Sequence, residues 1–330
     1  MNAKTLADGP PNAADAHPLP QRALVTGGAG FIGSHIVGTL LKGGSDVVVL
    51  DNFSSGYREN LPKHPCLKVI EGDVRDPAAL TQSVKGVETV FHLAASVGNK
   101  RSIDDPITDS DINVMGTLKL LLAARDHGIT KVVASSSAAV YGELQGLPIG
   151  EDHRLAPQTP YASSKLAMEH HALAFADLFG IEVVCLRYFN VYGENQRFDP
   201  YGNVIPIFAR RLVAGEPIIV YGDGEQTRDF VHVDDVVAAN LLAARARGVS
   251  GVFNVASGSR VTVNTLAQMM LNAAGWPPGA GVTHGPERVG DVRHSLANIS
   301  AAHTAFQYVP QVALNDGIPR YFGWFSEDTP

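Results

Sequence analysis

The chain has 330 residues, which exceeds the usual length of one domain and favours a large core or two lobes with a cleft between them. Its 45% hydrophobic and 18% charged residues are typical of a globular protein in water, and no apolar run approaches the roughly 20 residues of a membrane-spanning helix. The formal net charge of -7 gives no basic surface that could displace counterions from nucleic acid. We therefore expect neither a nucleic acid nor a membrane as a partner.

The first residues, MNAKTLADGPPNAADAHPLPQ, are rich in Pro, Ala and Asp and lack the apolar core of a signal peptide. We predict a disordered leader over residues 1–20 that has no catalytic role. The two cysteines, Cys66 and Cys185, have neither CxxC nor metal-site spacing, which indicates a reduced chain located in the cytoplasm.

From Ala23 onward, short β-branched runs alternate with longer amphipathic stretches, as a parallel sheet with crossover helices requires. The predicted strands are ALVT (23–26), DVVVL (46–50), LKVIE (67–71), TVFHL (89–93), KVVASS (131–136) and EVVCLRY (182–188). The predicted helices cover 31–44, 107–128 and 161–180, and each ends near a glycine that can cap a helix in the left-handed conformation. This order predicts an α/β fold with a doubly wound parallel sheet, the Rossmann architecture.

The residue composition changes after about Tyr188, where loops rich in Pro, Gly and Tyr precede a predicted helix at 233–248. We expect a cofactor-binding domain formed by residues 21–188 plus about 227–256. A smaller C-terminal substrate-binding lobe is expected from about 189–226 plus 257–330.

A glycine-rich segment, VTGGAGFIGSH, follows the first predicted strand and opens the first predicted helix. Its Gly27, Gly30 and Gly33 allow a tight turn and a close approach of helix N-terminal amides to a pyrophosphate. Asp51 ends the second strand about 20 residues further on, where a carboxylate can accept hydrogen bonds from an adenosine ribose and repels a 2'-phosphate. The pattern favours NAD over NADP, with a turn role for Asp51 as the alternative. Asp73, at the third strand end, is a candidate contact of adenine.

The motifs TGGAGFIG, HLAA, SSSAAVYG and YASSK resemble those of the extended short-chain dehydrogenase/reductase family, particularly its nucleotide-sugar epimerases and dehydratases. RYFNVYG and GDGEQTRDFVHVDD extend the resemblance through almost all of the chain after the leader. The resemblance implies a Rossmann domain with tightly held NAD, a nucleotide-sugar lobe, and a homodimer formed through the helices around 107–127 and 160–180. The expected cofactor contacts are Gly27, Gly30, Phe31, Ile32, Gly33, Asp51, Asn52, Ser55, Gly56, Asp73, Val74, Leu93, Ala94, Ala95, Asn113, Tyr161, Lys165 and Tyr188.

Tyr161 and Lys165 lie four residues apart in YASSK and share one face of a predicted helix beside the carboxyl edge of the sheet. The Lys165 ammonium and a positive nicotinamide ring can stabilise the Tyr161 phenolate, since a free tyrosine has a pKa of about 10. Without the surrounding motifs, a helical Tyr with a solvated Lys would be the simpler interpretation. By the resemblance, Ser137 completes the catalytic set by hydrogen-bonding the sugar hydroxyl, and Ser136 is its substitute.

The reaction type is indicated by Ala138 and Ala139, which follow Ser137 where the family's dehydratases and decarboxylases usually carry an acidic residue. A dehydratase protonates a departing hydroxyl, and a methyl side chain cannot supply that proton. The sequence therefore favours an isomerase, an NAD-dependent UDP-hexose 4-epimerase that acts through a 4-keto intermediate. A dehydratase that takes its acid from elsewhere and a non-catalytic NAD-binding regulator are the alternatives.

The substrate contacts that the resemblance implies lie mostly in the second half of the chain. Arg197 resembles an arginine that faces the C6 carboxylate of UDP-glucuronate, whereas the small Ser295 leaves room for an N-acetyl group. Asn190 stands where uronate epimerases often have threonine. UDP-glucuronate and UDP-N-acetylglucosamine are therefore near-equal candidates, with UDP-glucose behind them.

The whole expected substrate set includes two arginines for the diphosphate, Arg228 and Arg288. Its members are Ser136, Ser137, Asn190, Arg197, Asn203, Val204, Tyr221, Arg228, Arg288, Asp291 and Ser295. We expect no metal at HVDD (232–235), because two aspartates that open a helix are typical N-caps.

Overall fold

The computed structural model describes residues 18–199, 202–277, 281–287 and 293–328. Most of the predicted leader lies outside these residues, as do Arg288 and Asp291. Within the described part of the chain, no helix combines the length and the apolar character needed to cross a membrane.

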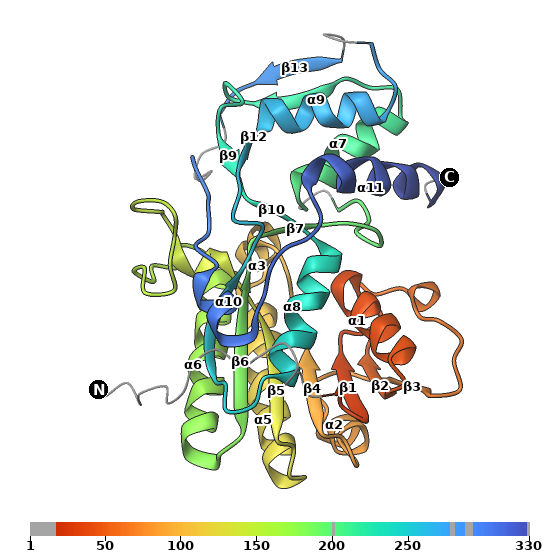
Figure 1. Ribbon diagram of the computed structural model, residues 1–330, viewed down its shortest axis with the longest axis vertical. Helices are drawn as coiled ribbons and strands as arrows, with labels where there is room; N and C mark the ends of the chain where they lie inside the picture. The colour runs from red at the N-terminus through yellow and green to blue at the C-terminus, as the bar shows by residue number, and fades with distance from the viewer. Residues whose placement is uncertain (1–17, 200–201, 278–280, 288–292, 329–330) are drawn as a thin grey trace.

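A seven-stranded parallel sheet forms the larger part of the molecule, with the strand order β11-β6-β5-β4-β1-β2-β3 (Figure 1). All six predicted strands are present, because their β-branched runs suit the interior of a sheet that is covered on both faces. Residues 251–255, which we did not predict as a strand, extend the sheet beyond β6. The strands are β1 (Arg22–Thr26), β2 (Asp46–Asp51), β3 (Leu67–Glu71), β4 (Thr89–His92), β5 (Lys131–Ser137), β6 (Glu182–Tyr188) and β11 (Gly251–Val255).

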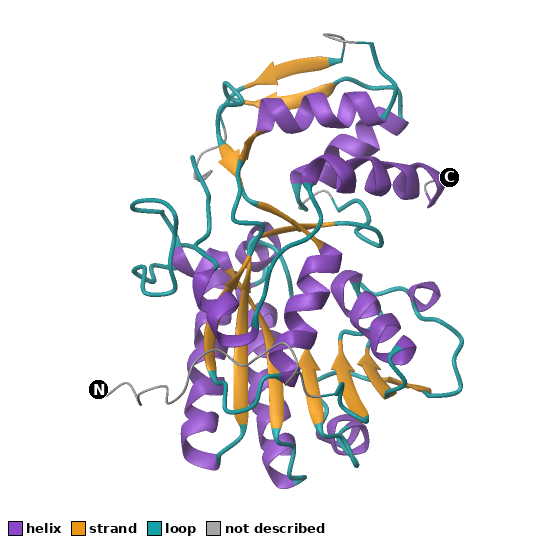
Figure 2. Ribbon diagram, viewed as in Figure 1, coloured by secondary structure: helices purple, strands orange, loops and turns teal. Residues whose placement is uncertain are grey.

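Helices cover both faces of this sheet (Figures 1 and 2). The core on one face contains residues of α1 (Phe31–Lys42), α8 (Val233–Arg245) and α10 (Ser300–Phe306). The core on the other face contains residues of α2 (Pro77–Ser83), α5 (Thr117–Asp126) and α6 (Pro160–Phe179). The sheet is therefore doubly wound, and its strand order reverses between β1 and β4, the point at which such folds bind dinucleotides.

A smaller lobe lies above the sheet in Figure 1 and has a separate apolar core. Two strand pairs, β7 with β10 and β9 with β12, connect segments that are far apart in the sequence. The elements are β7 (Asn190–Tyr192), α7 (Val204–Val213), β8 (Ile218–Tyr221), β9 (Thr227–Arg228), β10 (Phe230–His232), β12 (Val261–Thr262), α9 (Val263–Ala273), β13 (Val282–Gly285) and α11 (Leu314–Asp328).

One part of the expected division of the chain differs from the structure. We assigned all of 257–330 to the smaller lobe, but α10 returns to the sheet, where Ala302 and Phe306 join the core beside α1 and α8. The Phe306 ring meets that of Phe253 on β11, with centroids 5.2 Å apart. The apolar face of α10 is thus buried by the strand that the sequence analysis missed.

The predicted helix over 107–128 is not continuous. It is divided into α4 (Pro106–Ser110), a π-helical turn η3 (Asp111–Gly116) and α5. A π turn widens the helix by one residue per turn, so it changes which side chains share a face. A short α3 (Asn99–Asp104) precedes this segment, and a 3-10 turn, η4 (Ala138–Tyr141), follows β5.

Candidate active site

The tyrosine and lysine of YASSK lie in the first turns of α6, directly after the Thr159 N-cap, which accepts a hydrogen bond from the Ala162 amide. The Lys165 Nζ donates to the Ser135 carbonyl oxygen at 2.9 Å, and the residue is only 4% exposed. The Tyr161 phenol is hydrogen-bonded to the Ser137 side chain. The structure therefore brings the three predicted catalytic residues together at the carboxyl end of β5.

Burial has the largest effect on the pKa of both Tyr161 and Lys165. It raises the pKa of the Tyr161 phenol to about 12, although the Ser137 hydrogen bond acts in the opposite direction. Burial also lowers the pKa of the Lys165 ammonium to about 8, while the charges of Asp109 and Glu169 oppose that change. Tyr161 therefore needs further positive charge beside it before it can work as a base near neutral pH.

Ser136 does not share this position, because adjacent residues of a strand point to opposite faces. Its hydroxyl donates to the Glu169 carboxylate at 2.5 Å, and the residue is only 3% exposed. Glu169 in turn pairs with Arg187 through two hydrogen bonds of 2.9 and 2.8 Å. The expectation that Ser136 could replace Ser137 at the substrate is therefore wrong: its hydroxyl belongs to a buried ion pair.

Asn113 lies in the π turn, where its side chain fastens the loop that follows β4. It accepts from the Ser96 amide at 2.8 Å and donates to the Ser96 carbonyl at 3.0 Å. It also donates to Ser164 and to Asp109. Sequence reasoning singled out Asn113 but missed Asp109, a buried carboxylate whose only sequence signal is its position four residues before Asn113.

The glycine-rich turn has the shape that a pyrophosphate requires. Gly27 has a φ of 68°, and a Cβ on Gly33 would lie 2.2 Å from the Gly27 carbonyl oxygen. Among the described residues, no side chain caps the N-terminus of α1 and no acidic residue stands in its first turn. The amides of Phe31 and Ile32, which open this helix, can thus meet an anionic group.

Asp51 ends β2 and is positioned by two backbone amides, since it accepts from Ala29 and Phe53 at 2.8 Å each. A carboxylate has room for about four hydrogen bonds, so these contacts leave acceptor capacity for two ribose hydroxyls. Leu93 and Ala94 lie against the same turn, because a Cβ on Gly27 would be 2.7 Å from the Ala94 amide nitrogen. These features fit the adenosine and diphosphate of NAD.

The other expected cofactor contacts surround this turn. Gly56 approaches it so closely that a Cβ there would be 2.9 Å from the Ala29 carbonyl carbon. Asp73 accepts from Asn52 at 2.9 Å, and its hydrogen bond with Arg75 lowers the pKa of that carboxyl to about 2. Val74 is buried in the core, Ser55 is exposed, and Ala95 directly follows Ala94 in the loop after β4.

Tyr188 ends β6 directly opposite Ser137 in the strand register. Its hydroxyl accepts from the Asn240 amide at 2.8 Å, and burial raises the pKa of its phenol. Its ring, rather than its hydroxyl, is therefore the part available beside the catalytic residues.

Four residues of the expected substrate set belong to elements of the smaller lobe or directly precede one: Asn190, Asn203, Val204 and Tyr221. Asn190 donates to the Asp229 carbonyl and Asn203 to the Val191 carbonyl, each at 3.3 Å. Val204 opens α7, and Tyr221 ends β8. Separate parts of the chain supply these residues, and none of the hydrogen bonds or ring contacts of the described residues joins them to Tyr161.

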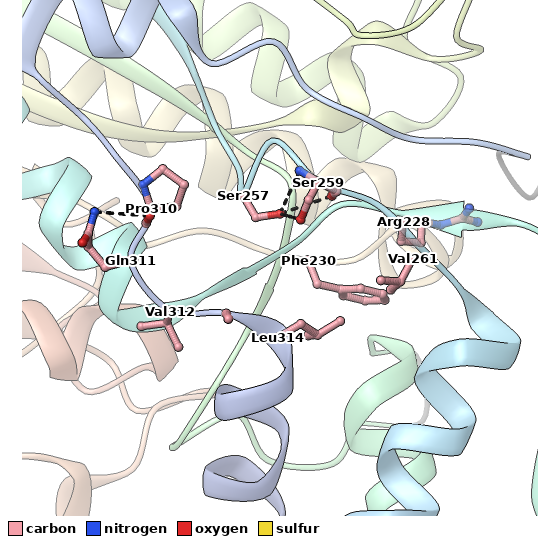
Figure 3. A pocket seen from close by; sticks show the side chains of 10 residues that line it. Arg228, Phe230, Ser257, Ser259, Val261, Pro310, Gln311, Val312 and Leu314 are labelled. Atoms are coloured by element: carbon pink, nitrogen blue, oxygen red, sulfur yellow. Dashed lines mark hydrogen bonds between the residues drawn. The ribbon is translucent and has the colours of Figure 1, made fainter.

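A pocket of about 210 Å³ lies beside Arg228, at the junction of β10 with the segment leading into α11 (Figure 3). Phe230, Val261 and Leu314 supply its apolar wall. The pocket shares Arg228 with the expected substrate set but contains none of the three catalytic residues. It is therefore not the place where a sugar would react.

Arg197 lies elsewhere than expected. Its guanidinium carbon is 4.0 Å from the Tyr57 ring centroid, and its Nη2 is 3.4 Å from a carboxylate oxygen of Glu59. The same loop is fastened to α1 by an Asn195 hydrogen bond to Ser34 at 3.0 Å. Arg197 thus pairs with the loop after β2 on the cofactor side, and this position does not support its expected contact with a C6 carboxylate.

The HVDD segment also differs from expectation, because His232, not an aspartate, is the N-cap of α8 and accepts from the Asp234 amide. Asp235 instead accepts from the amides of Gln311 and Val312, which tethers the segment before α11. Within the described ranges, no three His, Cys, Asp or Glu side chains gather as a metal site.

Comparisons with known proteins agree with this geometry. The model of a family described as "NAD dependent epimerase/dehydratase family" matches residues 23–256. A protein of Methanocaldococcus jannaschii named "Putative UDP-glucose 4-epimerase" is 39% identical over 310 residues, which cover 92% of this chain and 98% of that protein.

Two solved structures are similar over nearly their whole length. UDP-N-acetylglucosamine 4-epimerase from Methanobrevibacter ruminantium, in complex with UDP-N-acetylmuramic acid, has a TM-score of 0.89 and 37% identity and covers 94% of this chain and 99% of its own. A dTDP-glucose 4,6-dehydratase from Streptomyces venezuelae with NAD bound has a TM-score of 0.85 and 33% identity, and it covers 93% and 97%. These findings confirm the family that the motifs indicated and the expectation that its cofactor is NAD.

Proposed function

The chain belongs to the NAD dependent epimerase/dehydratase family, and we propose that it is a UDP-sugar 4-epimerase with UDP-N-acetylglucosamine as its first substrate. The observation that carries the proposal is the meeting of α6 with the end of β5, where Lys165 donates to the Ser135 carbonyl and Ser137 acts on the Tyr161 phenol. This arrangement suits removal of a proton from a sugar hydroxyl, as epimerisation at C4 requires.

In the proposed reaction, Ser137 hydrogen-bonds the C4 hydroxyl while Tyr161 removes its proton. NAD, when bound, supplies the hydride acceptor and donor for C4. The resulting 4-keto sugar rotates within the site, so that the hydride returns to the opposite face of C4. Tyr161 returns the proton to the C4 oxygen, which completes the inversion. Bringing the Tyr161 pKa from about 12 to neutrality needs roughly 7 kcal/mol of phenolate stabilisation, a role that the proposal assigns to Lys165 and, when NAD is bound, to its positive nicotinamide ring.

A dehydratase would need an acid near the sugar's C6 hydroxyl. Ala138 and Ala139 stand in the 3-10 turn that follows Ser137 and cannot supply one. Glu143, just beyond that turn, is exposed, and the Glu151 carboxylate accepts from the Asn254 amide at 2.7 Å. These positions support epimerisation over dehydration.

The choice of sugar rests on Ser295 and Arg197. Ser295 is a small, buried residue whose amide donates to the Thr227 carbonyl at 3.1 Å beside β9. A small side chain at this position favours a substrate with a bulky C2 substituent. UDP-glucuronate is the second candidate, but the Glu59 carboxylate already pairs with the Arg197 guanidinium that would recognise a uronate. UDP-N-acetylglucosamine is therefore preferred.

We also propose that the protein is a homodimer. Apolar side chains at spacings of four, eight and seven residues stay exposed along α3, α4, η3 and α5, and two more are exposed at the end of α6. These six residues are Ile103, Ile107, Met115, Leu122, Leu178 and Phe179. A second copy of the same helices is the partner that the family resemblance implies for this surface.

The function is tested by incubating the purified protein, without added NAD, with each member of three pairs of UDP-sugars separately. The pairs are the gluco and galacto forms of UDP-N-acetylhexosamine, UDP-hexose and UDP-hexuronate. For a true substrate pair, both starting sugars converge on one mixture, and we expect the N-acetyl pair to do so fastest. Arg197→Ala, assayed in parallel, should leave that rate within a factor of about two. If the protein binds UDP-sugars but converts none of them, the result favours a non-catalytic regulator. A 4-keto product that has lost one water molecule would identify a dehydratase.

A further inference from the structure

Asp109 is a buried carboxylate beside the catalytic residues. It lies in α4 and is 1% exposed. Ser164, the residue before Lys165, donates to one carboxylate oxygen at 2.6 Å, and Asn113 donates to the other at 3.2 Å. Both partners are neutral, and the hydrogen bonds and ion pairs of the described residues give Asp109 no cation in direct contact. A buried charge without a counter-charge is costly, so its nearest cation matters.

Lys165 is likewise a buried charged group whose hydrogen bond goes to a neutral partner. Its ammonium is buried and donates to a neutral carbonyl, that of Ser135. Glu169 also lies within electrostatic range of Lys165, but two hydrogen bonds from Arg187 compensate its charge. Asp109 is thus the buried carboxylate near Lys165 that no other cation of the described residues balances.

The remaining titratable groups around Lys165 are neutral near pH 7. Burial raises the pKa of the Cys185 thiol and lowers the pKa of the His92 imidazole to about 3. His92 is also held between the hydroxyls of Thr26 and Thr117, at 2.8 and 2.9 Å. Among the described residues, the main charges that act on Tyr161 and Lys165 are therefore those of Asp109 and of the compensated Glu169–Arg187 pair.

We propose that Asp109 is a positioning residue for the proposed epimerase reaction: its carboxylate balances the Lys165 ammonium, orients Ser164 and Asn113, and thereby fixes the pH range in which Tyr161 and Lys165 work together. The proposal rests on the proposed function for its kinetic part only. The π turn between Asp111 and Gly116 supports it, because this turn lets Asn113 contact Asp109, Ser164 and the loop after β4 at once.

The effect of the charge has a definite sign. A negative carboxylate disfavours the Tyr161 phenolate and favours the Lys165 ammonium, so both groups keep their protons to higher pH. The working state needs a phenolate and an ammonium together. Removing the negative charge should therefore move the rising and the falling limbs of the rate profile to lower pH in parallel.

The kinetic test compares pH profiles of kcat for UDP-N-acetylglucosamine epimerisation, with NAD content measured for each protein. Asp109→Asn removes the charge but keeps the shape, and we expect both limbs to move down by about one pH unit. Ser164→Ala is the matched control, since it removes the hydrogen bond and keeps the charge, so its limbs should stay in place. An Asp109→Asn profile that has the wild-type limbs at reduced height would overturn the proposal, because a merely structural residue lowers the rate without moving the limbs.

A stability measurement tests the charge pairing without any activity. Asp109→Asn and Lys165→Met should each lower Tm, because each leaves one buried charge uncompensated. The double variant should melt above both single variants, because both charges are then absent. This rescue is expected even if Asp109→Asn alone does not fold. A double variant whose Tm loss equals the sum of the single losses would show that the two groups are not coupled and would refute the proposal. If the double variant shows this rescue but the wild-type protein converts no UDP-sugar, only the proposed function is refuted.

Discussion

The Lys165 Nζ lies 2.9 Å from the Ser135 carbonyl oxygen. This hydrogen bond joins the first turns of α6 to the carboxyl end of β5. The same junction brings Tyr161 to Ser137, two residues beyond Ser135 on the same face of the strand. In the proposed reaction, the helix thus supplies the base, and the strand supplies the hydroxyl that orients the substrate.

Replacing Tyr161 with Phe removes the proposed base and leaves the ring. We expect kcat to fall by about a thousandfold, within the range that general bases contribute. Affinity for the UDP-sugar, measured by calorimetry, should change by less than a factor of about three, because the proposed nucleotide contacts are made by other residues. A variant that retains a tenth of the wild-type kcat would show that another group takes the proton.

The alkaline side of the pH profile should report Lys165. Burial lowers the pKa of its ammonium to about 8, so the charge that stabilises the phenolate is lost as pH rises through that value. The wild-type kcat is therefore expected to fall above pH 8. Lys165→Arg keeps its charge throughout this range and should lack the alkaline fall, whatever its maximal rate. A wild-type profile that stays flat up to pH 10 would exclude this role for Lys165.

Gly33 tests the cofactor site by sterics. An added methyl would lie 2.2 Å from the Gly27 carbonyl oxygen, so Gly33→Ala must displace the turn that is proposed to meet the pyrophosphate. We expect the purified variant to contain less than about a tenth of the wild-type NAD. Gly38→Ala, in the same helix with nothing within 4 Å of the new methyl, is the matched control and should keep its NAD. Equal NAD content in the two variants would place the cofactor elsewhere.

The buried pair of Glu169 and Arg187 should be important for stability. Glu169→Gln leaves the Arg187 guanidinium buried with its charge uncompensated, at an expected cost of about 3 to 5 kcal/mol in the free energy of unfolding. Glu71→Gln is the control, because its partner Arg58 is at the surface and such pairs contribute little. Chemical denaturation of the two variants gives the comparison, and similar losses in both would contradict the account.

The proposed dimer can be tested by placing charged side chains on its expected interface. Ile107 is 79% exposed and Met115 is 46% exposed, and both lie on the surface formed by α3, α4, η3 and α5. Ile107→Glu combined with Met115→Lys should halve the mass measured by light scattering. Val309→Lys is a control of matched exposure, at 48%, outside this surface. A wild-type protein that is already monomeric would refute the dimer.

The sequence predicted the elements whose pattern is local. Six strands, the turn at Gly27 and the helix that bears Tyr161 all follow from short local motifs, namely β-branched runs, closely spaced glycines and an amphipathic stretch. β11 was missed because GVFNV is a short run, and its pairing with β6 depends on a partner more than 60 residues away in the chain. α10 was assigned to the smaller lobe for the same reason, since its partner is β11.

The side-chain errors have a different cause. Ser136 and Ser137 are identical residues, and only the alternation of a strand decides that one hydroxyl meets Glu169 and the other Tyr161. Arg197 was placed by analogy, whereas its contacts with Tyr57 and Glu59 depend on how two distant loops meet. Apart from its position four residues before Asn113, Asp109 gave no signal in the sequence, because an aspartate in a polar helical stretch is ordinarily solvated.

The central claim is that C4 loses and regains the same hydride while Tyr161 exchanges only the hydroxyl proton. It is tested most directly by running the reaction in deuterium oxide on UDP-N-acetylglucosamine and following the sugar by NMR. The account predicts an epimerised product that has no carbon-bound deuterium at any ring or C6 position. Deuterium incorporated at C5 or C6 would contradict it, because that label requires protonation at carbon, as in a dehydratase.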